Sequence, residues 1–248
     1  MISHAKLLSI PALAFLAPTL VFSQITLPDT LFVKATVENA KQIYHQSTKS
    51  YSRLYNGKEY IEFKKNMPEI GTPFFRSEDW EEGQVFYDGE LYEKVFMRYD
   101  LLQEKLVVEH KGHGEIELIS EKIKYFRIAG HTFVRLEEKI GNKSPISPGF
   151  YDLIYDGNTK VYVKRLKITE EKVETQLSMI LTFKEKNSVI ISKKGAYSLV
   201  GNKSSALKVF GDQKSALKKF ISKNKIRCRA NREEALIKIA GHYDQLAN

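Results

Sequence analysis

The sequence predicts a mainly β protein, folded as an antiparallel sandwich or as a curled, partly open barrel. Two observations support this prediction. Short runs rich in Val, Phe and Tyr recur between residues 83 and 200, and these side chains pack well on a pleated surface. Turn signals separate the runs about every 8 to 12 residues, without helix-length patterns between them. Parallel strands would need long crossover connections, so we expect antiparallel strands.

The clearest hairpin is expected at residues 83–100, around Asp88-Gly89. Both central positions of a type I′ turn need positive φ, which Asp and Gly tolerate well. A second hairpin signal is Asn56-Gly57, which is flanked by strand-like runs of aromatic and aliphatic residues.

The remaining strands are predicted from the same pattern of apolar runs and turns. They are expected at residues 106–108, 116–118, 123–128, 133–136, 149–155, 161–163, 177–183, 189–191 and 196–200. Residues 68–80, with two prolines and three aromatic residues, favour an irregular or edge segment whose rings cover the core. The sequence Gly-Asn-Lys-Ser occurs at 141–144 and at 201–204, and we interpret both copies as turns rather than as phosphate-binding loops.

Helical spacing of apolar residues is found near the two ends of the chain. A short amphipathic helix is expected at residues 36–46. In the tail, Gly211 is expected to end one helix, and Asn231 with Glu234 fits an N-terminal cap of another. The apolar positions of the tail are Leu217, Phe220, Ile221, Leu236, Ile239, Ala240 and Tyr243. A pair or trio of C-terminal helices is therefore expected to pack on the sheet.

The N-terminus is typical of a secretory signal peptide. Lys6 precedes a mostly apolar run from Leu7 to Phe22, and Val21 and Ser23 supply small or tolerated residues at −3 and −1 of a cut before Gln24. A membrane anchor is the alternative, but this run is shorter than the ~20 residues that a spanning helix needs. No transmembrane segment is expected in the mature chain. The expected parts are a signal peptide at 1–23, a β-rich domain at 24–200 and a basic helical segment at 201–248 packed on the same domain.

Cys228 is the only cysteine, so an intrachain disulfide cannot form. Its position between Arg227 and Arg229 is compatible with a reactive thiol. An exposed basic turn explains the same residues. Because the sequence places no partner histidine beside it, no catalytic role is predicted for Cys228.

Two histidines could contribute to a metal site. His110 and His113 are spaced as His-Lys-Gly-His, and zinc would need at least one further protein ligand. The nearby candidates are Glu109, Glu115 and His131. A Gly-rich turn with solvated histidines is the simpler interpretation, so no metal ligand and no cofactor are predicted.

Three acidic residues could support hydrolysis of a glycoside, which requires two carboxyl groups facing each other across a cleft. They are Asp88, Asp100 and Asp156. Two of them precede glycines in turns, where Asp is common for backbone reasons. The sequence contains no Walker loop, His-Glu-x-x-His, Gly-x-Ser-x-Gly or dinucleotide fingerprint. No catalytic residue is predicted.

The positive charge of the chain is concentrated in one segment. Residues 202–232 contain ten Lys or Arg residues and one acid, a balance of +9 that equals the formal net charge of the whole protein. The residues expected to contact an anionic surface are Lys214, Lys218, Lys219 and Lys223. The expected partners are anionic lipid, lipopolysaccharide or an acidic envelope protein, and not nucleic acid. The alternative is a solvated helix face without a partner.

Several stretches carry a family resemblance. They are the run Gly83 to Val108, the run Gly149-Phe150-Tyr151 through Lys164, and the tail ending Gly241-His242-Tyr243-Asp244. Together with the Val-Phe-Ser-Gln junction, the chain resembles a family of uncharacterised exported β-rich proteins of Bacteroidota-type bacteria. The resemblance implies location in the cell envelope, at the periplasm or the outer-membrane periphery, and it implies no activity.

The function expected from these features is non-enzymatic: binding or interaction at the cell envelope, with an unknown ligand. Two alternatives remain open. The first is a carrier that holds a lipid or another apolar ligand in a concave sheet, and the second is a hydrolase that uses carboxylates or a histidine-based metal site.

Overall fold

The structure is a computed structural model that describes residues 33–34, 36–40, 53–110, 112, 114–137, 145–175 and 178–247. The chain divides into two compact units, residues 1–50 and 51–248. In the first unit the described residues are helical, and they overlap the start of the helix predicted at 36–46. The expected signal peptide at 1–23 lies outside the described residues.

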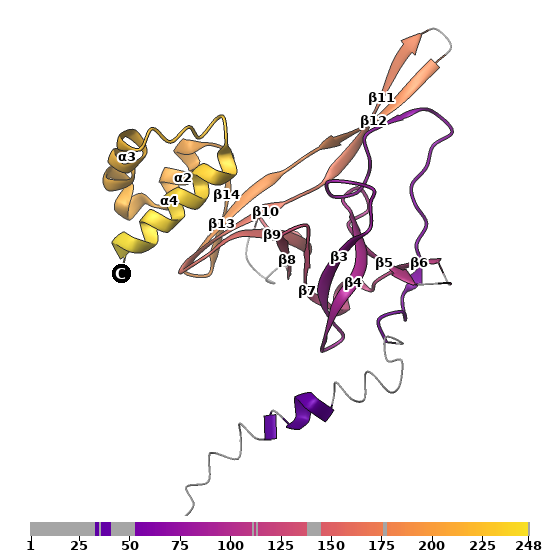
Figure 1. The fold of residues 1–248 in the computed structure, drawn as a ribbon. Helices are drawn as coiled ribbons and strands as arrows, with labels where there is room; N and C mark the ends of the chain where they lie inside the picture. Colours follow the sequence, from indigo (N-terminus) through magenta and orange to yellow (C-terminus); the bar gives the residue numbers. More distant parts are fainter. Residues whose placement is uncertain are drawn as a thin grey trace, which may run out of the picture. The chain divides into compact units, whose positions relative to one another are not determined.

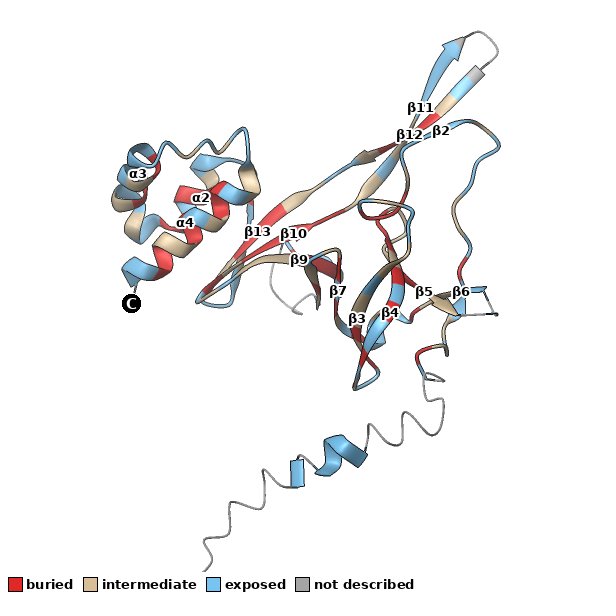
Figure 2. Ribbon diagram, viewed as in Figure 1, coloured by how far each residue is buried: buried red, intermediate tan, exposed pale blue. Residues whose placement is uncertain are grey.

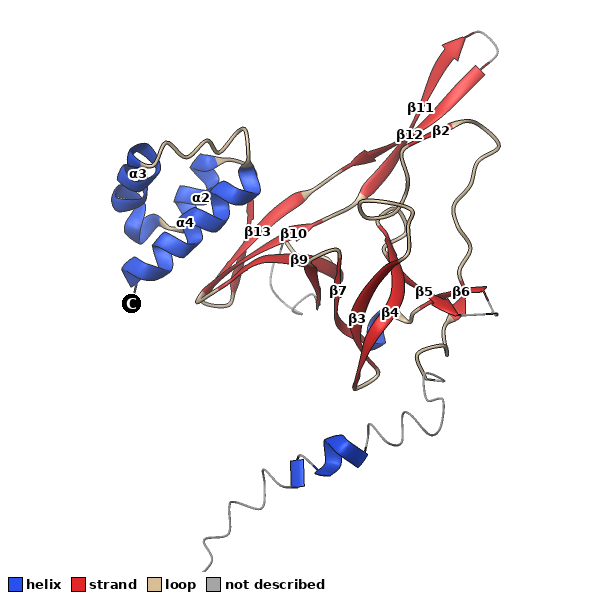
Figure 3. Ribbon diagram, viewed as in Figure 1, coloured by secondary structure: helices blue, strands red, loops and turns tan. Residues whose placement is uncertain are grey.

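The second unit is mainly β, as the sequence predicts, and its strands and helices are shown in Figures 1 and 3. The strands are β1 (Lys58–Glu59), β2 (Glu69–Ile70), β3 (Glu81–Tyr87), β4 (Glu90–Asp100), β5 (Lys105–His110), β6 (Gly114–Glu117), β7 (Ile123–Ile128), β8 (His131–Leu136), β9 (Gly149–Asp156), β10 (Thr159–Lys164), β11 (Lys167–Thr175), β12 (Ser178–Glu185), β13 (Ser188–Lys193) and β14 (Ala196–Val200). The helices are α2 (Lys203–Val209), α3 (Lys214–Lys223) and α4 (Arg232–Ala247), with short 3₁₀ turns η1 (Ser120–Lys122) and η2 (Gly211–Gln213).

Eleven strands form one antiparallel sheet in the order β1-β6-β5-β4-β3-β7-β8-β9-β10-β13-β14. The sheet has two different strands at its edges, so it is open rather than closed into a barrel. Between β10 and β13 the chain leaves this sheet and forms the long hairpin β11–β12, which extends away from it (Figure 1). Strand β2 adds to β12 in parallel and completes a second, three-stranded sheet.

The main sheet curls strongly between β4 and β9. These strands are four positions apart in the sheet, which would separate them by about 19 Å in a flat sheet with ~4.8 Å between neighbours. The rings of Tyr99 on β4 and Phe150 on β9 nevertheless lie 5.9 Å apart, and Tyr99 also lies 5.0 Å from Phe133. Phe126 stacks on Phe133 at 4.9 Å. The concave face is thus filled by aromatic side chains, and buried segments alternate with exposed ones along β4 in Figure 2.

Of the two hairpins predicted from Asp-Gly and Asn-Gly signals, one is present in the structure. Asp88 and Gly89 have φ of 50° and 85°, as the predicted type I′ turn between β3 and β4 requires. The hairpin predicted at Asn56-Gly57 is wrong, because the next strand, β1, pairs with β6. A Cβ at Gly57 would overlap the carbonyl of Glu117 on β6, so the glycine permits this close approach of two strands.

Helices α2 and α4 cover the face of the sheet that carries Val161, Val163 and Ile191, and α3 packs on these two helices. Leu217 and Ile221 of α3 and the predicted apolar stripe of α4 are buried in the same apolar cluster, in agreement with the expected pair or trio of helices. Asn231 accepts a hydrogen bond from the backbone N–H of Glu234 at 3.2 Å, as predicted for the start of α4. Gly211 does not have the positive φ of a helix-ending glycine; it begins η2, which leads directly into α3.

We expect Phe133→Ala to destabilise the protein by about 3–5 kcal/mol, because it removes a fully buried ring that packs against the rings of Phe75, Tyr99 and Phe126. Chemical denaturation measures the loss. Leu199→Ala on the edge strand β14 is the control: Leu199 is 57% exposed, so its truncation should change the free energy of unfolding by no more than about 0.5 kcal/mol. Equal losses in the two variants would contradict a core centred on the concave face.

Candidate functional site

Asp152 on β9 lies where the two apolar clusters of the main sheet meet. It is opposite Phe133 on β8 and Val163 on β10, so its side chain shares their face of the sheet. Phe133 belongs to the aromatic cluster of the concave face, and Val163 belongs to the cluster under the helices. Asp152 is 1% exposed, and a buried carboxylate in this position needs partners.

Those partners form a continuous polar connection. Arg165, in the chain just after β10, donates from Nε to Oδ2 of Asp152 at 2.7 Å. The same guanidinium donates two hydrogen bonds to Glu233 at the start of α4, at 3.1 and 2.8 Å. On the other side, His131 Nδ1 lies 2.7 Å from Oδ2 of Asp152. The connection therefore joins β8, β9 and α4 through one buried cation and two carboxylates.

The charge of Arg165 is held in place by this connection. Burial lowers the pKa of Arg165, but the hydrogen bonds that it donates to Glu233 and the charge of Asp152 outweigh this effect, so the pKa is raised. Replacing both members of a buried ion pair by apolar residues changes the stability of a protein little. Removing only one member is destabilising, because it leaves an uncompensated buried charge. The connection consequently fixes the position of α4 relative to β9.

A His–Asp pair also invites comparison with a catalytic triad, in which the second ring nitrogen activates a nucleophile. Here that nitrogen, Nε2 of His131, lies 2.8 Å from Nη2 of Arg76, which can only donate. This geometry places the imidazole proton on Nδ1, facing Asp152. The nitrogen that would act as a general base already accepts a hydrogen bond from a cation, so the pair has a structural role.

A second buried carboxylate fixes the far end of α4. Asp244 accepts hydrogen bonds from the hydroxyl of Tyr155 at 3.0 Å and from the backbone N–H of Thr159 at 3.0 Å. A Cβ at Gly157 would overlap the Asp244 carboxylate, so the β9–β10 turn can approach the helix only with glycine at this position. The carboxylate therefore ties this turn to the last turns of α4.

Asp212 connects η2 to the sheet and to α4. Lys193 of β13 donates to Oδ1 of Asp212 at 2.6 Å, and the Tyr243 hydroxyl donates to Oδ2 at 2.8 Å. Hydrogen bonds from Lys193 and then Tyr243 lower the pKa of Asp212 to about 2. This one acid of the basic segment is thus already paired with a lysine outside the segment.

The three carboxylates considered for hydrolysis are held by different groups. Asp88 pairs with Lys122 at 3.1 Å, and Asp156 pairs with Lys160. Asp100 is fully buried, accepts from the Tyr60 hydroxyl at 2.8 Å, and also accepts from two backbone N–H groups of the β4–β5 turn. The hydrogen bonds of the described residues do not bring any two of these carboxylates together.

The residues considered as metal ligands are likewise engaged elsewhere. The His110 ring packs edge-on against Tyr55 with centroids 4.0 Å apart, and Glu115 pairs with Arg98 at 2.6 Å. His113 lies outside the described residues. Within the part of the chain that the structure describes, no group of three or more His, Cys, Asp or Glu side chains could hold a metal ion.

The lysines predicted to contact an anionic surface are all exposed on α3. Lys219 and Lys223 lie opposite the buried Leu217 and Ile221, and Lys214 and Lys218 lie at the side of this buried stripe. We call these four residues the lysine face. Among the described residues none of them forms an ion pair. In the β region carboxylates pair with Lys105, Lys160, Lys164 and Lys184, whereas Lys124, Lys172 and Lys186 are exposed without an ion pair among the described residues.

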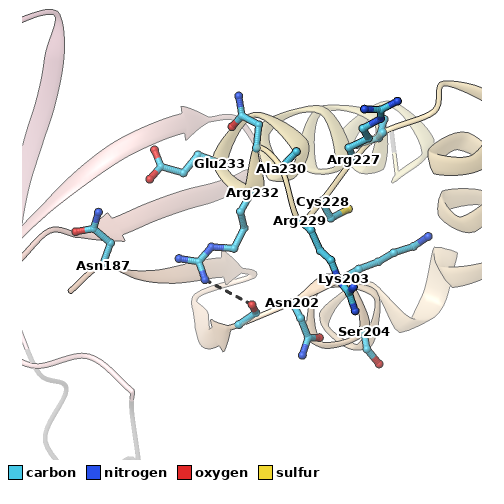
Figure 4. A pocket seen from close by; sticks show the side chains of 13 residues that line it. Asn187, Asn202, Lys203, Ser204, Arg227, Cys228, Arg229, Ala230, Arg232 and Glu233 are labelled. Carbon is cyan, nitrogen blue, oxygen red and sulfur yellow. Dashed lines mark hydrogen bonds between the residues drawn. The ribbon is translucent and has the colours of Figure 1, made fainter. Parts of the chain in front are cut away.

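A basic pocket lies beside the lysine face in sequence, between the start of α2 and the start of α4 (Figure 4). Its volume is about 1150 Å³. Its charged and thiol-bearing lining residues are Lys203, Arg227, Cys228, Arg229, Arg232 and Glu233. Sequence reasoning identified the charge of this segment and the basic setting of Cys228, but it did not predict a pocket.

Sequence reasoning also missed Asp152, Arg165, Glu233 and Asp244. One signal was present: Asp152 interrupts an otherwise apolar strand, and a charged residue in such a strand is seldom buried without a partner. The partner could not be identified, because Glu233 is far away in sequence and meets Arg165 only in the folded chain.

Comparisons with family models, curated proteins and solved structures give no match for this chain. In the described part of the chain no helix has the length and apolar character required to cross a membrane.

We expect Asp152→Ala to destabilise the protein by about 3–5 kcal/mol, because it leaves the buried Arg165 without its inner partner. Asp156→Ala, four residues further along the same region, removes an exposed ion pair and should cost less than about 1 kcal/mol. Urea denaturation of both variants measures the difference. A loss at Asp152 as small as the loss at Asp156 would show that the connection is not required.

The pH dependence of stability provides a test of Asp212. Its pKa is about 2 in the folded protein and ~3.9 in an unfolded chain, so the ionised side chain stabilises the fold above about pH 4. This contribution is lost as the pH falls from 4 to 2. Because the carboxylate is half exposed, we expect less than about 1 kcal/mol. Asp212→Asn should reduce the acid-induced loss of unfolding free energy, whereas Asp79→Asn should match the wild type.

Proposed function

We propose that this protein is a non-enzymatic binding module of the cell envelope that docks on an anionic lipid surface through its C-terminal basic segment. The observation that carries the proposal is the lack of charge compensation in residues 202–232. The only acid of this segment, Asp212, is bound by Lys193 and Tyr243. The lysine face is exposed, and its four residues lack carboxylate partners among the described residues.

The arrangement of charge supports a surface rather than a small ligand as the partner of the lysine face. Its four lysines extend along α3, which is ten residues long, and all four are exposed without an ion pair among the described residues. Each Lys near an anionic membrane contributes about 1 kcal/mol, and the contribution decreases with salt. Four lysines therefore suffice for reversible binding without an inserted apolar segment.

The carrier alternative lacks a comparable observation. The concave face, where an apolar ligand would lie, is occupied by the rings of Tyr99, Phe126, Phe133 and Phe150. The hydrolase alternative has three carboxylates with separate partners and a histidine–aspartate pair whose second ring nitrogen is bound by Arg76. Docking through the basic segment is thus the function that the described geometry supports best. The export that it requires is expected from the N-terminal sequence.

Sedimentation of the full chain with vesicles tests the docking. We expect binding to phosphatidylcholine vesicles that contain phosphatidylglycerol, weaker binding at higher salt, and no binding to phosphatidylcholine alone. Lys218→Glu/Lys219→Glu/Lys223→Glu should weaken binding at least about 100-fold, since three favourable contributions of ~1 kcal/mol become unfavourable.

The matched control reverses the charge of three exposed lysines outside the basic segment, Lys124, Lys172 and Lys186. Its net charge equals that of the α3 variant, so a loss caused by net charge alone would affect both variants. An equal loss in both variants, or binding that does not depend on salt, would contradict docking through the lysine face.

A further inference from the structure

The basic pocket has the dimensions and charge of a site for a phosphorylated ligand. At about 1150 Å³ it is at least as large as typical small-molecule pockets, which occupy roughly 300–1,000 Å³. Its walls come from the start of α2, the start of α4 and the loop that precedes α4. In Figure 4 the side chain of Arg229 extends from that loop toward Lys203, and the side chain of Arg232 extends from α4 toward the backbone carbonyl of Gly201.

The charges that line the pocket are not neutralised from within it. Its one acid, Glu233, accepts two hydrogen bonds from the buried Arg165 and is therefore already compensated. Lys203, Arg227 and Arg229 are exposed and form no ion pair with the described residues. Arg232 donates only to the backbone carbonyl of Gly201, at 3.5 Å. The pocket therefore gathers four cations without a free counter-charge.

Two features add to the preference for an anion. Helix α4 is 16 residues long, and its N-terminus, which carries the partial positive charge of the helix dipole, forms part of the wall. Three of the four cations are arginines, whose planar guanidinium groups can donate two parallel hydrogen bonds to phosphate oxygens. An anion with several acceptor oxygens and more than one negative charge could bind several of these cations at once.

We propose that the pocket lined by Lys203, Arg229 and Arg232 binds a phosphate monoester group. The monoester carries nearly two negative charges at neutral pH and exposes three acceptor oxygens, whereas a phosphodiester carries one charge. This chemistry occurs both in soluble sugar or glycerol phosphates and in lipid headgroups. The inference deepens the proposed function, and it rests on that function only for a lipid source, because a soluble monoester can bind without any membrane.

Cys228 allows the occupancy of the pocket to be measured directly. It lines the pocket and is the only cysteine of the chain, so alkylation by iodoacetamide reports on this position alone. In the full chain at about 0.15 M salt, glycerol 3-phosphate should slow the alkylation of Cys228 in a saturable manner. Dimethyl phosphate at the same concentrations should have little effect. Calorimetric titration of glycerol 3-phosphate should give one site per chain.

The variants separate the pocket from the lysine face. Lys203→Gln/Arg229→Gln removes two exposed cations that form no bond with the described residues, so the fold should be retained. We expect it to weaken glycerol 3-phosphate binding by about tenfold or more, because hydrogen bonds to a charged group are lost. Lys218→Gln/Lys219→Gln removes the same charge from α3 and should leave this binding unchanged.

Vesicles distinguish the two sources of the phosphate. If the ligand is a lipid headgroup, phosphatidic acid should bind more tightly than phosphatidylglycerol at equal surface charge, and the preference should disappear in Lys203→Gln/Arg229→Gln. If the ligand is soluble, the two lipids should bind equally while glycerol 3-phosphate still protects Cys228. Absence of protection by glycerol 3-phosphate together with equal binding of both lipids would overturn the pocket proposal, and docking through the lysine face would still stand.

Discussion

Two hydrophobic cores lie on the same face of the main sheet, and the fold depends on how they are joined. The curled half of the sheet packs on itself through aromatic rings, and the other half packs against the helices. Asp152 and Arg165 lie where these two clusters meet, and both are almost completely buried. Because Arg165 also binds Glu233, the strand that ends the curled half is joined to the first turn of α4. The position of the helical segment follows from this ion pair and from the apolar surface around it.

The same contacts determine where charge remains unpaired. Carboxylates at three points hold the helical segment to the sheet: Glu233 and Asp244 lie on α4, and Asp212 lies in η2. Each of them is paired with a residue of the β region. The cations of residues 202–232 are thereby left without carboxylates of their own, and most of them are exposed. The acidic residues thus hold the helical segment against the sheet, while most of its lysines and arginines remain exposed to solvent. This separation is the physical reason for the proposed docking and for the charge of the pocket.

Local chemistry made much of this fold predictable from the sequence. The Asp88-Gly89 turn, the apolar strands and the stripe of α4 each depend on neighbouring residues, and the structure confirms them. The sequence did not predict β11, because its charged run Thr-Glu-Glu-Lys lacks the apolar alternation of a strand. The backbone of this run is extended because it pairs with β12. The expected hairpin at Asn56-Gly57 failed for a related reason: the close approach of Glu117 from a distant strand decided the conformation. The lysine face was found from helical spacing alone, whereas the pocket requires three segments that only the folded chain brings together.

The proposed docking requires that the basic segment, and not the sheet, binds the anionic partner. Backbone amide NMR spectra of the ¹⁵N-labelled full chain, recorded with and without bicelles that contain phosphatidylglycerol, locate the binding surface residue by residue. We expect chemical-shift changes and line broadening to concentrate in residues 203–232 and to decrease as salt is added. Changes centred on the concave aromatic face or on the β11–β12 hairpin, with residues 203–232 unaffected, would contradict it.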